Sequence, residues 1–347
     1  CLDVARYKKE NNIGVMQSSR EQEIIDRVKS MSDEKYKDSV SLLFTNIMDI
    51  SKSFQQNEIN KGVTFIEKKP LEIAPSAKAG CFGVKGSNSE EAARKIFGKE
   101  KELSFYSEFE DVFKAVCDGE IDFGVVPLQN SSTGSITQTY DLMHKYNVYI
   151  NKMIRVSIRH CLAAKGTDIK GIEKVYSHPQ ALAQSDDFIR SNGIEANEYI
   201  NTAMAAKLVA ESNDSSIGAI GSTLAAELYG LEVIAPSIQT VKNNTTRFIT
   251  ISKQLIIPDN ANKVSVVFSL PHAVGALQRI LNRFCINGLN LTKIESRSAK
   301  NGEFEYLFYL DFSGNLNERK TISLISSLSK ELPDFAFLGN FRENEIK

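Results

Sequence analysis

Apolar residues recur at helical spacing through the first sixty residues. The pattern predicts a helix over residues 2–9, a second that begins after Ser18 and Ser19, and a third over about 33–59. The third helix carries an apolar stripe of Val40, Leu43, Ile47, Ile50 and Phe54. Three helices of such unequal length make a poor independent core. We therefore expect this helical segment, residues 1–61, to pair with a second copy of the chain.

Two polar residues continue a second apolar line on the third predicted helix. Ser51 and Gln55 follow Phe44 and Met48 at helical spacing. They are either ligand contacts or the point at which the buried face reaches water. The spacing alone favours the second interpretation.

From residue 79 the pattern changes to alternating strands and helices, after a segment at 62–78 without periodicity that is predicted to be a linker. Two strand–helix lobes are expected, at about 79–155 plus 240–254 and at 156–239, and a long β-type run at 153–164 crosses between them. This is the pattern of a bilobal α/β binding-protein fold with a cleft between the lobes. The lone Gly83-x-x-Gly86 is not a dinucleotide fingerprint, so no nucleotide site is expected.

The last segment, residues 263–341, shows the order β-α-β-β-α-β. Strands are predicted at 263–270, 290–296, 305–312 and 335–338, with helices at 272–287 and 316–331. This order is typical of the α+β ferredoxin-like plan. The chain is therefore predicted to be multidomain, with an all-α, a bilobal α/β and an α+β part.

One polar stretch stands out at the start of a predicted strand. Asn243, Asn244, Thr245, Thr246 and Arg247 precede the β-type run that begins at Phe248. Hydrogen-bonding groups at a strand end suit ligand binding in α/β proteins, and the arginine fork suits a carboxylate. The alternative is an Asx/Thr turn with a solvated arginine.

Composition narrows the choice of function. The formal net charge is −1, which gives no electrostatic case for binding nucleic acid or an acidic membrane, and no apolar run is long enough to span a bilayer. Five scattered cysteines without CxxC spacing indicate reduced thiols in a cytoplasmic protein, and no metal or cofactor is expected. Because the chain begins with Cys1 inside a predicted helix, we expect that N-terminal sequence is missing.

The helical segment resembles the all-helical class of chorismate mutase. The match consists of Val4-x-x-x-Lys8, Arg20-Glu21 and Ser51-x-x-x-Gln55. The resemblance implies that Lys8 and Arg20 bind the carboxylates of chorismate, while Glu21, Ser51 and Gln55 meet its hydroxyl and ether oxygens. Gln17 stands where the family often has aspartate, and two further family arginines belong upstream of Cys1, so the mutase site is incomplete as written.

Residues 79–254 resemble prephenate dehydratase through five motifs in the family's order. They are Gly83-x-x-Gly86-Ser87-x-Ser89, Val126-Pro127-Leu128-x-Asn130-Ser131-x-x-Gly134, His178-Pro179-Gln180-Ala181-Leu182-Ala183-Gln184, Ala219-Ile220-Gly221-Ser222-x-x-Ala225-Ala226-x-x-Tyr229-Gly230-Leu231 and Asn244-x-Thr246-Arg247-Phe248. Gln129 replaces the family's glutamate before Asn130, so any role that needs a carboxylate there is in doubt.

The resemblance also implies roles for the site residues. Thr246 would donate a hydrogen bond to the leaving hydroxyl of prephenate, and Arg247 would support or bind a carboxylate. Asn130 and Gln184 would fix the substrate from opposite lobes. Ser87, Ser89, Ser131 and Ser222 are candidate lining residues, or else helix N-caps, and the sequence leaves both open. For His178, before Pro179 at a helix start, a structural role is expected.

The C-terminal segment resembles the ACT regulatory domain. The match is Gly275-Ala276-Leu277 and Glu295-Ser296-Arg297, two motifs that build a phenylalanine site at a domain–domain interface in that family. Gln278 and Ser298 differ from the usual residues there. Despite these two differences, the resemblance implies L-phenylalanine as effector. It also implies a homodimer or homotetramer, because both flanking domains usually pair in such proteins.

Two classes of function stay open. The first is an allosteric dehydratase that converts prephenate to phenylpyruvate and is fused to a chorismate mutase. The second is a bilobal binding module that has lost turnover, for which Gln129 is the only hint. A substrate-binding protein of the cell envelope is a weaker third possibility, disfavoured by the flanking domains.

Overall fold

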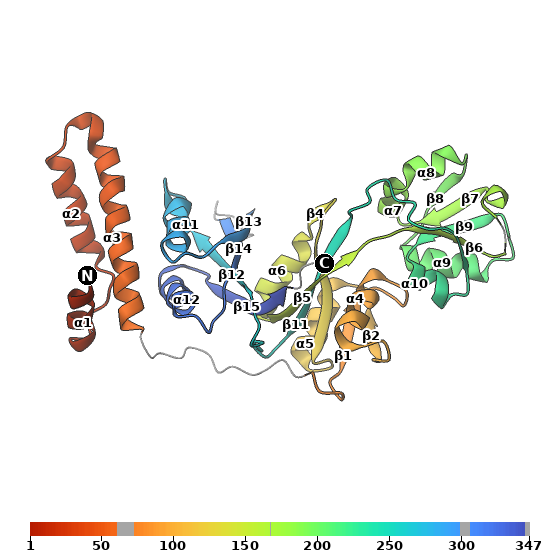
Figure 1. Ribbon diagram of the computed structural model, residues 1–347, viewed down its shortest axis with the longest axis horizontal. Coiled ribbons are helices and arrows are strands. Elements are labelled where there is room, and N and C mark those ends of the chain that lie inside the picture. Colours follow the sequence, from red (N-terminus) through yellow and green to blue (C-terminus); the bar gives the residue numbers. More distant parts are fainter. Residues whose placement is uncertain (61–72, 167, 299–305, 344–347) are drawn as a thin grey trace. The chain divides into compact units, whose positions relative to one another are not determined.

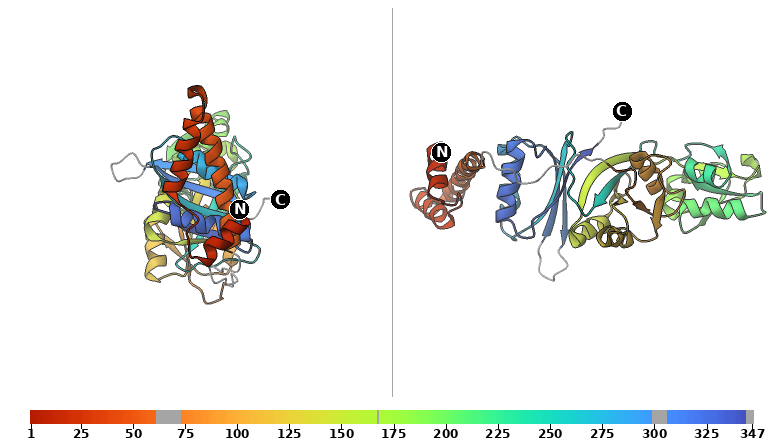
Figure 2. Two further views of the ribbon diagram at one scale, coloured as in Figure 1. Left: turned by 90° about the vertical axis from the view of Figure 1, so that its left-hand side faces the viewer. Right: turned by 90° about the horizontal axis from the view of Figure 1, so that it is seen from below.

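A computed structural model describes residues 1–60, 73–166, 168–298 and 306–343, drawn in Figures 1 and 2. The chain forms two compact units. The first holds Cys1–Pro70 and Ile256–Arg342, and the second holds Leu71–Leu255 with Glu343–Lys347. Most of the predicted linker lies outside the described residues. Within the described part, no helix has the length and apolar character needed to cross a membrane.

The N-terminal helices bury almost no apolar surface of their own. Helices α1 (Leu2–Glu10) and α2 (Ser18–Ser30) pack against α3 (Lys37–Ile59), which a short 3₁₀ turn at Glu34–Tyr36 precedes. The buried residues of this segment are Ala5, Asp49, Gln55 and Asn60. The apolar stripe stays 42% to 55% exposed at Leu43, Ile47, Ile50 and Phe54. The segment therefore has the poor independent core that its sequence predicts.

The C-terminal segment has ferredoxin-like topology. Its elements are β12 (Lys263–Leu270), α11 (Ala276–Ile286), β13 (Leu291–Ser298), β14 (Tyr306–Ser313), α12 (Arg319–Glu331) and β15 (Ala336–Glu343). The strands form an antiparallel sheet in the order β13-β14-β12-β15, and both helices lie on one face of it (Figure 2). Phe284 of α11 meets Phe312 of β14 edge to face, with ring centroids 5.0 Å apart.

The first lobe of the second unit is a mixed sheet in the order β5-β11-β3-β1-β2. Strand β1 runs parallel to β2 and β3, and β11 runs antiparallel to β3 and β5. The elements are β1 (Ala79–Phe82), α4 (Asn88–Phe97), β2 (Leu103–Tyr106), α5 (Phe109–Asp118), β3 (Phe123–Asn130), β4 (Gly134–Ser135), α6 (Thr137–Tyr146), β5 (Tyr149–Ser157) and β11 (Thr245–Ser252).

The second lobe is a smaller sheet in the order β10-β6-β9-β7-β8. The parallel strands β7, β8 and β9 make up most of it, and β6 and β10 are antiparallel additions. The elements are β6 (Cys161–Ala164), β7 (Lys174–Ser177), α7 (Pro179–Gln184), α8 (Asp186–Ser191), β8 (Glu195–Glu198), α9 (Thr202–Glu211), β9 (Ile217–Gly221), α10 (Thr223–Leu228) and β10 (Glu232–Ala235), with a 3₁₀ turn at Ile169–Gly171.

Two segments cross between the lobes, from β5 to β6 and from β10 to β11 (Figure 1). The run predicted as one strand at 153–164 is thus two strands that belong to different sheets. The crossing segments are tied together, because the amide of Ile158 donates to the carbonyl of Asn244 at 2.8 Å and that of Ile238 donates to His160 at 2.9 Å. These bonds fix the start of β11 against the end of β5.

Strand β3 extends further than its sequence predicts. The sequence predicts a strand over 121–126 followed by a hydroxyl-rich loop at 127–135, whereas residues 127–130 continue β3 and pair with β11. The pairing shifts register between Arg247 and Phe248, so Leu128 is an extra residue on β3. Such a bulge is where a strand accommodates proline, and it carries Asn130 to a position opposite Thr246.

The lobes also meet at a glycine in the loop after β1. Gly86 is buried with φ +85°, and a Cβ built there would lie 3.1 Å from both the Cα and the Cβ of Ala225 in α10. The position therefore needs glycine for two reasons, its left-handed backbone and the close approach of the second lobe.

We predict that Gly86→Ala destabilises the second unit more than Gly119→Ala does. Both glycines have positive φ, but a Cβ at Gly119 meets nothing within 4 Å. Backbone strain is thus common to both variants, and the clash with Ala225 should add about 1–3 kcal/mol for Gly86→Ala. Urea denaturation of the two variants measures the difference, and equal losses would show that the contact between the lobes is unimportant.

Candidate functional site

The site is built around a contact between the ends of β3 and β11. Asn130 Nδ2 donates to Thr246 Oγ1 at 2.8 Å and to Asn244 Oδ1 at 2.8 Å. Its Oδ1 accepts from the amides of Ser132 and Thr133 at 2.9 and 3.1 Å. Every polar group of this amide is therefore engaged, which fixes its orientation. Asn130 and Thr246 each keep only 7% exposure.

Asn244 links this contact to the other lobe. It is 2% exposed, and while its Oδ1 accepts from Asn130, its Nδ2 donates to Gln184 Oε1 at 3.1 Å. Gln184 lies at the end of α7, in the second lobe. A chain of side-chain amides thus connects Thr246 to the predicted residue from the opposite lobe.

A buried histidine completes the arrangement. His160 Nε2 lies 2.9 Å from Gln184 Oε1, and since an amide oxygen only accepts, the ring nitrogen carries the hydrogen. Burial lowers the pKa of His160, against an opposing effect of the bond to Gln184, so the ring is neutral near pH 7. Two donors hold the Gln184 oxygen, and among the described residues its amide nitrogen donates to none.

The chemistry available here is uncharged hydrogen bonding. Thr246 Oγ1 accepts from Asn130, so its own hydrogen is available to an oxygen outside the network. The Gln184 amide nitrogen offers a second donor. No group of three or more His, Cys, Asp or Glu side chains in the described ranges is placed to hold a metal ion.

Arg247, the residue expected to support or bind a carboxylate, does not join this group. Successive side chains of a strand point to opposite faces, so Arg247 lies on the reverse of the sheet. There its Nε donates to Glu343 Oε1 at 3.0 Å, its Nη2 also pairs with Glu343, and its Nη1 donates to Gln129 Oε1 at 3.2 Å. The carboxylate that it binds in this structure belongs to the chain itself.

The predicted serines have structural roles as well. Ser87 caps α4 by accepting from the amide of Glu90, and Ser222 caps α10 while its hydroxyl donates to the carbonyl of Gly86 at 3.0 Å. Ser131 accepts from the amide of Thr245 at 2.9 Å, beside Asn244, and Ser89 is buried in the first turn of α4. The ring of His178 caps α7, the structural role expected for it.

The residues predicted for chorismate lie on all three N-terminal helices. Gln55 Nε2 donates to Ser51 Oγ at 3.0 Å on α3. Lys8 Nζ donates to the carbonyl of Val15 at 3.0 Å, and burial together with the charge of Arg20 lowers its pKa. Arg20 itself is exposed.

Glu21 has a partner that the sequence did not suggest. Lys52 Nζ lies 2.9 Å from Glu21 and 2.8 Å from Asp49. Burial acts to lower the pKa of Lys52, but the two carboxylates outweigh it and raise the pKa above its usual value. Lys52 thus stays charged beside the predicted hydroxyl-binding glutamate.

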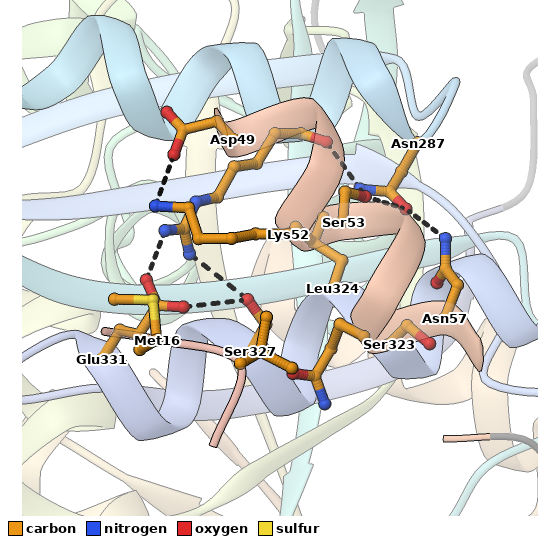
Figure 3. A pocket seen from close by; sticks show the side chains of 13 residues that line it. Met16, Asp49, Lys52, Ser53, Asn57, Asn287, Ser323, Leu324, Ser327 and Glu331 are labelled. Atoms are coloured by element: carbon orange, nitrogen blue, oxygen red, sulfur yellow. Dashed lines mark hydrogen bonds and ion pairs between the residues drawn. The ribbon is translucent and has the colours of Figure 1, made fainter. Parts of the chain in front are cut away.

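A small cavity lies between α3 and the helices α11 and α12 (Figure 3). In Figure 3 Asn287 lies between Ser53 and Asn57 and forms hydrogen bonds with both. Ser327 points toward Glu331 and donates a hydrogen bond to its carboxylate. The volume of about 30 Å³ holds only about two waters, and the lining contains none of the predicted site residues. We assign no substrate to it.

The two ACT-like motifs lie at the start of α11 and on β13. Gly275 precedes α11 with φ +78°, a conformation that favours glycine. Glu295 and Arg297 lie on one face of β13 and pair with each other, while Ser296 is exposed on the other face. Arg297 Nε is buried and has no hydrogen-bond partner among the described residues, which stop at 298 and resume at 306.

Sequence reasoning missed three residues that the structure brings to the site or to its reverse face. Asn244 lies in the polar stretch and in the motif that the sequence singles out, but neither indicated a role for it separate from that of Thr246. Nothing local distinguished His160 or Glu343, because their partners lie 24 and 96 residues away along the chain.

Comparison with known proteins shows which families the chain is similar to. A family model described as "Prephenate dehydratase" matches residues 79–256, and one described as "Chorismate mutase type II" matches residues 1–56. The arogenate dehydratase/prephenate dehydratase 2 of Arabidopsis thaliana is 35% identical, over 75% of this chain and 71% of that protein. The bifunctional chorismate mutase/prephenate dehydratase of Aquifex aeolicus is 29% identical, over 97% and 90%.

A solved structure is similar as well. The prephenate dehydratase of Arthrobacter aurescens in complex with L-Phe superposes with a TM-score of 0.69 at 28% identity, and covers 76% of this chain and 89% of that chain.

We predict that His160→Gln makes the free energy of unfolding depend less steeply on pH on the acid side of neutrality. The folded-state pKa of His160 lies below the ordinary value of about 6.5, so the unfolded chain takes up a proton that the folded chain refuses as the pH falls. The parent should therefore lose stability from about pH 7 downward, by at most about 1.4 kcal/mol per pH unit from this group. Urea denaturation between pH 7 and pH 5 measures the slope. The matching change at the exposed His272 should leave it unaltered, and an unaltered slope in His160→Gln would contradict the assignment.

Proposed function

The chain belongs to the prephenate dehydratase family and carries a chorismate mutase segment at its N-terminus, and we propose that Thr246, Asn130 and Gln184 convert prephenate to phenylpyruvate. The observation that carries this proposal is the bond from Asn130 Nδ2 to Thr246 Oγ1. It uses the oxygen of the threonine as an acceptor and leaves its hydrogen free to serve a substrate.

The reaction requires little from the protein besides positioning and one donor. The electron pair of the breaking bond between the ring and its carboxylate moves into the ring as carbon dioxide is released, and the ring hydroxyl leaves as hydroxide, which takes up a proton from solvent to become water. Because the product ring is aromatic, the step is strongly favoured once it begins. Thr246 stabilises the departing hydroxyl by a hydrogen bond as negative charge develops on it.

The substrate carboxylates need partners other than Arg247, whose guanidinium is occupied by Glu343. We assign this work to uncharged donors, namely the Gln184 amide nitrogen and the N-terminus of α4 that Ser87 caps. Donors of this kind bind carboxylates well where water is scarce.

Further parts of the proposal rest on the flanking segments. Lys8, Arg20, Glu21, Ser51 and Gln55 would bind chorismate in the N-terminal helices and supply prephenate. The ferredoxin-like segment would act as an ACT domain that binds L-phenylalanine, as the Arthrobacter aurescens protein does. The exposed stripe of α3 would be covered by a second copy in a homo-oligomer.

We predict that Thr246→Ala lowers phenylpyruvate formation from prephenate by about 100-fold or more, the loss expected when a donor to a developing charge is removed. Thr246→Ser keeps the hydroxyl and is the matched control, so it should retain much of the turnover. The assay follows phenylpyruvate absorbance with purified full-length chain.

The same assay separates the enzyme from a binding module. A parent chain that binds prephenate without turnover would overturn the dehydratase proposal, and Gln129→Glu would then be the next variant to make. Turnover that survives Thr246→Ala would keep the reaction but reject Thr246 as the donor.

We also predict that L-phenylalanine changes the turnover of the parent and that Arg297→Ala abolishes this response while basal turnover is kept. The buried Nε of Arg297 has no acceptor within the described part of the chain, so it can donate to the carboxylate of an amino acid. Arg319→Ala, at an exposed position of α12, is the control and should respond as the parent does. A full response in Arg297→Ala would place the effector site elsewhere.

A further inference from the structure

We propose that Glu343 is a positioning residue for the dehydratase site, which holds Arg247 on the reverse face of β3 and β11 and so keeps Thr246 against Asn130. The proposal rests on the function proposed for Thr246. It assigns a role to a residue outside the span 79–256 that matches the dehydratase family model.

Glu343 forms the centre of a cluster on three strands of the first lobe. One carboxylate oxygen, Oε1, accepts from Arg155 Nε and Nη2 at 3.2 and 2.9 Å and from Arg247 Nε at 3.0 Å. Arg155 lies on β5, Arg247 on β11, and the remaining Arg247 nitrogen reaches Gln129 on β3. The carboxylate therefore ties together the strand that carries Thr246 and, through Arg247, the strand that carries Asn130.

The charges explain why a carboxylate is needed there. Arg155 and Arg247 are direct partners in the pairing of β5 with β11, and like charges at such positions repel. Gln129 is paired with Arg247 on the other side but carries no charge. Glu343 provides a negative charge between the two arginines, and its side chain is only 5% exposed.

Protonation behaviour agrees with this arrangement. Burial acts to raise the pKa of Glu343, but the guanidinium groups of Arg247 and Arg155 outweigh it and hold the pKa below the usual range. The carboxylate is therefore ionised at neutral pH, where the pair with Arg247 is a charge-assisted contact.

The cluster bears on the site through strand register. Arg247 pairs with Gln129 directly beside the pair Thr246–Asn130, and the register shift lies immediately after it. An irregular pairing is less firmly fixed by backbone bonds alone. Side-chain anchors at Arg247 thus determine which residue of β3 stands opposite Thr246, and a displacement of about 1 Å there is enough to reduce turnover strongly.

The test removes the negative charge at Glu343 and then introduces a new carboxylate on a neighbouring strand. Glu343→Gln keeps the shape of the side chain, and we expect kcat for prephenate to fall about 10-fold or more with a smaller change in KM, because alignment and not binding is impaired. Adding Gln129→Glu to Glu343→Gln places a carboxylate on β3 within reach of Arg247, and it should restore most of the lost kcat.

The control is Glu331→Gln, which breaks a similarly buried pair with Arg283 in the other unit and should leave basal kcat unchanged. Thr246→Ala, assayed in parallel, separates the two proposals. If it loses turnover while Glu343→Gln keeps the parental kcat, the inference about Glu343 is wrong and the site stands. If Glu343→Gln folds poorly and the double variant regains folding without kcat, the role of Glu343 is structural only and the inference is also overturned.

Discussion

The site depends on one buried amide that serves both lobes. Asn244 accepts from Asn130 in the first lobe and donates to Gln184 of the second, and it is 2% exposed. An aspartate of the same shape would face the Gln184 oxygen with a second acceptor, and an apolar residue would remove one hydrogen bond from Asn130 and one from Gln184 and so disconnect the two lobes at this point. The backbone carbonyl of Asn244 also accepts a hydrogen bond from the amide of Ile158 in the crossing segment. The same residue therefore holds the two lobes together and fixes the geometry of the site.

The charged side chains near the site lie on the opposite face of the first-lobe sheet. Thr246, Asn130 and Gln184 are uncharged, whereas Arg247, Arg155 and Glu343 form a compensated cluster behind them. A reaction driven by the formation of an aromatic ring needs alignment more than it needs a strong acid. Hydrogen bonds between buried neutral groups align the substrate at a low desolvation cost. The ionic cluster lies on the other face, so it can stabilise the strands without binding the dianionic substrate.

Local patterns predicted most elements of both lobes and the ferredoxin-like order, because strand and helix periodicity and hydroxyl-rich loops are properties of short windows. They also brought Thr246, Asn130 and Gln184 together, through motifs. They failed where distant segments decide. The segment after residue 126 was predicted to be a loop, but it pairs with β11 across a bulge, and the motif around Thr246 does not indicate that strand alternation places Arg247 on the opposite face. The contact between Asn130 and Asn244 spans 114 residues, a pairing that no local signal specifies.

The two units differ in how much apolar surface a single copy of the chain buries. The second unit has apolar clusters in each lobe, with Phe248 and Val125 in one and Ile220 and Val175 in the other. The N-terminal helices show the reverse distribution, with Asp49 and Gln55 buried and an apolar stripe exposed. Such a helix face is stable only when another surface covers it. The exposed stripe therefore supports a second copy of the chain for the segment proposed to make prephenate, whereas the segment proposed to consume it has an apolar core in each of its own lobes.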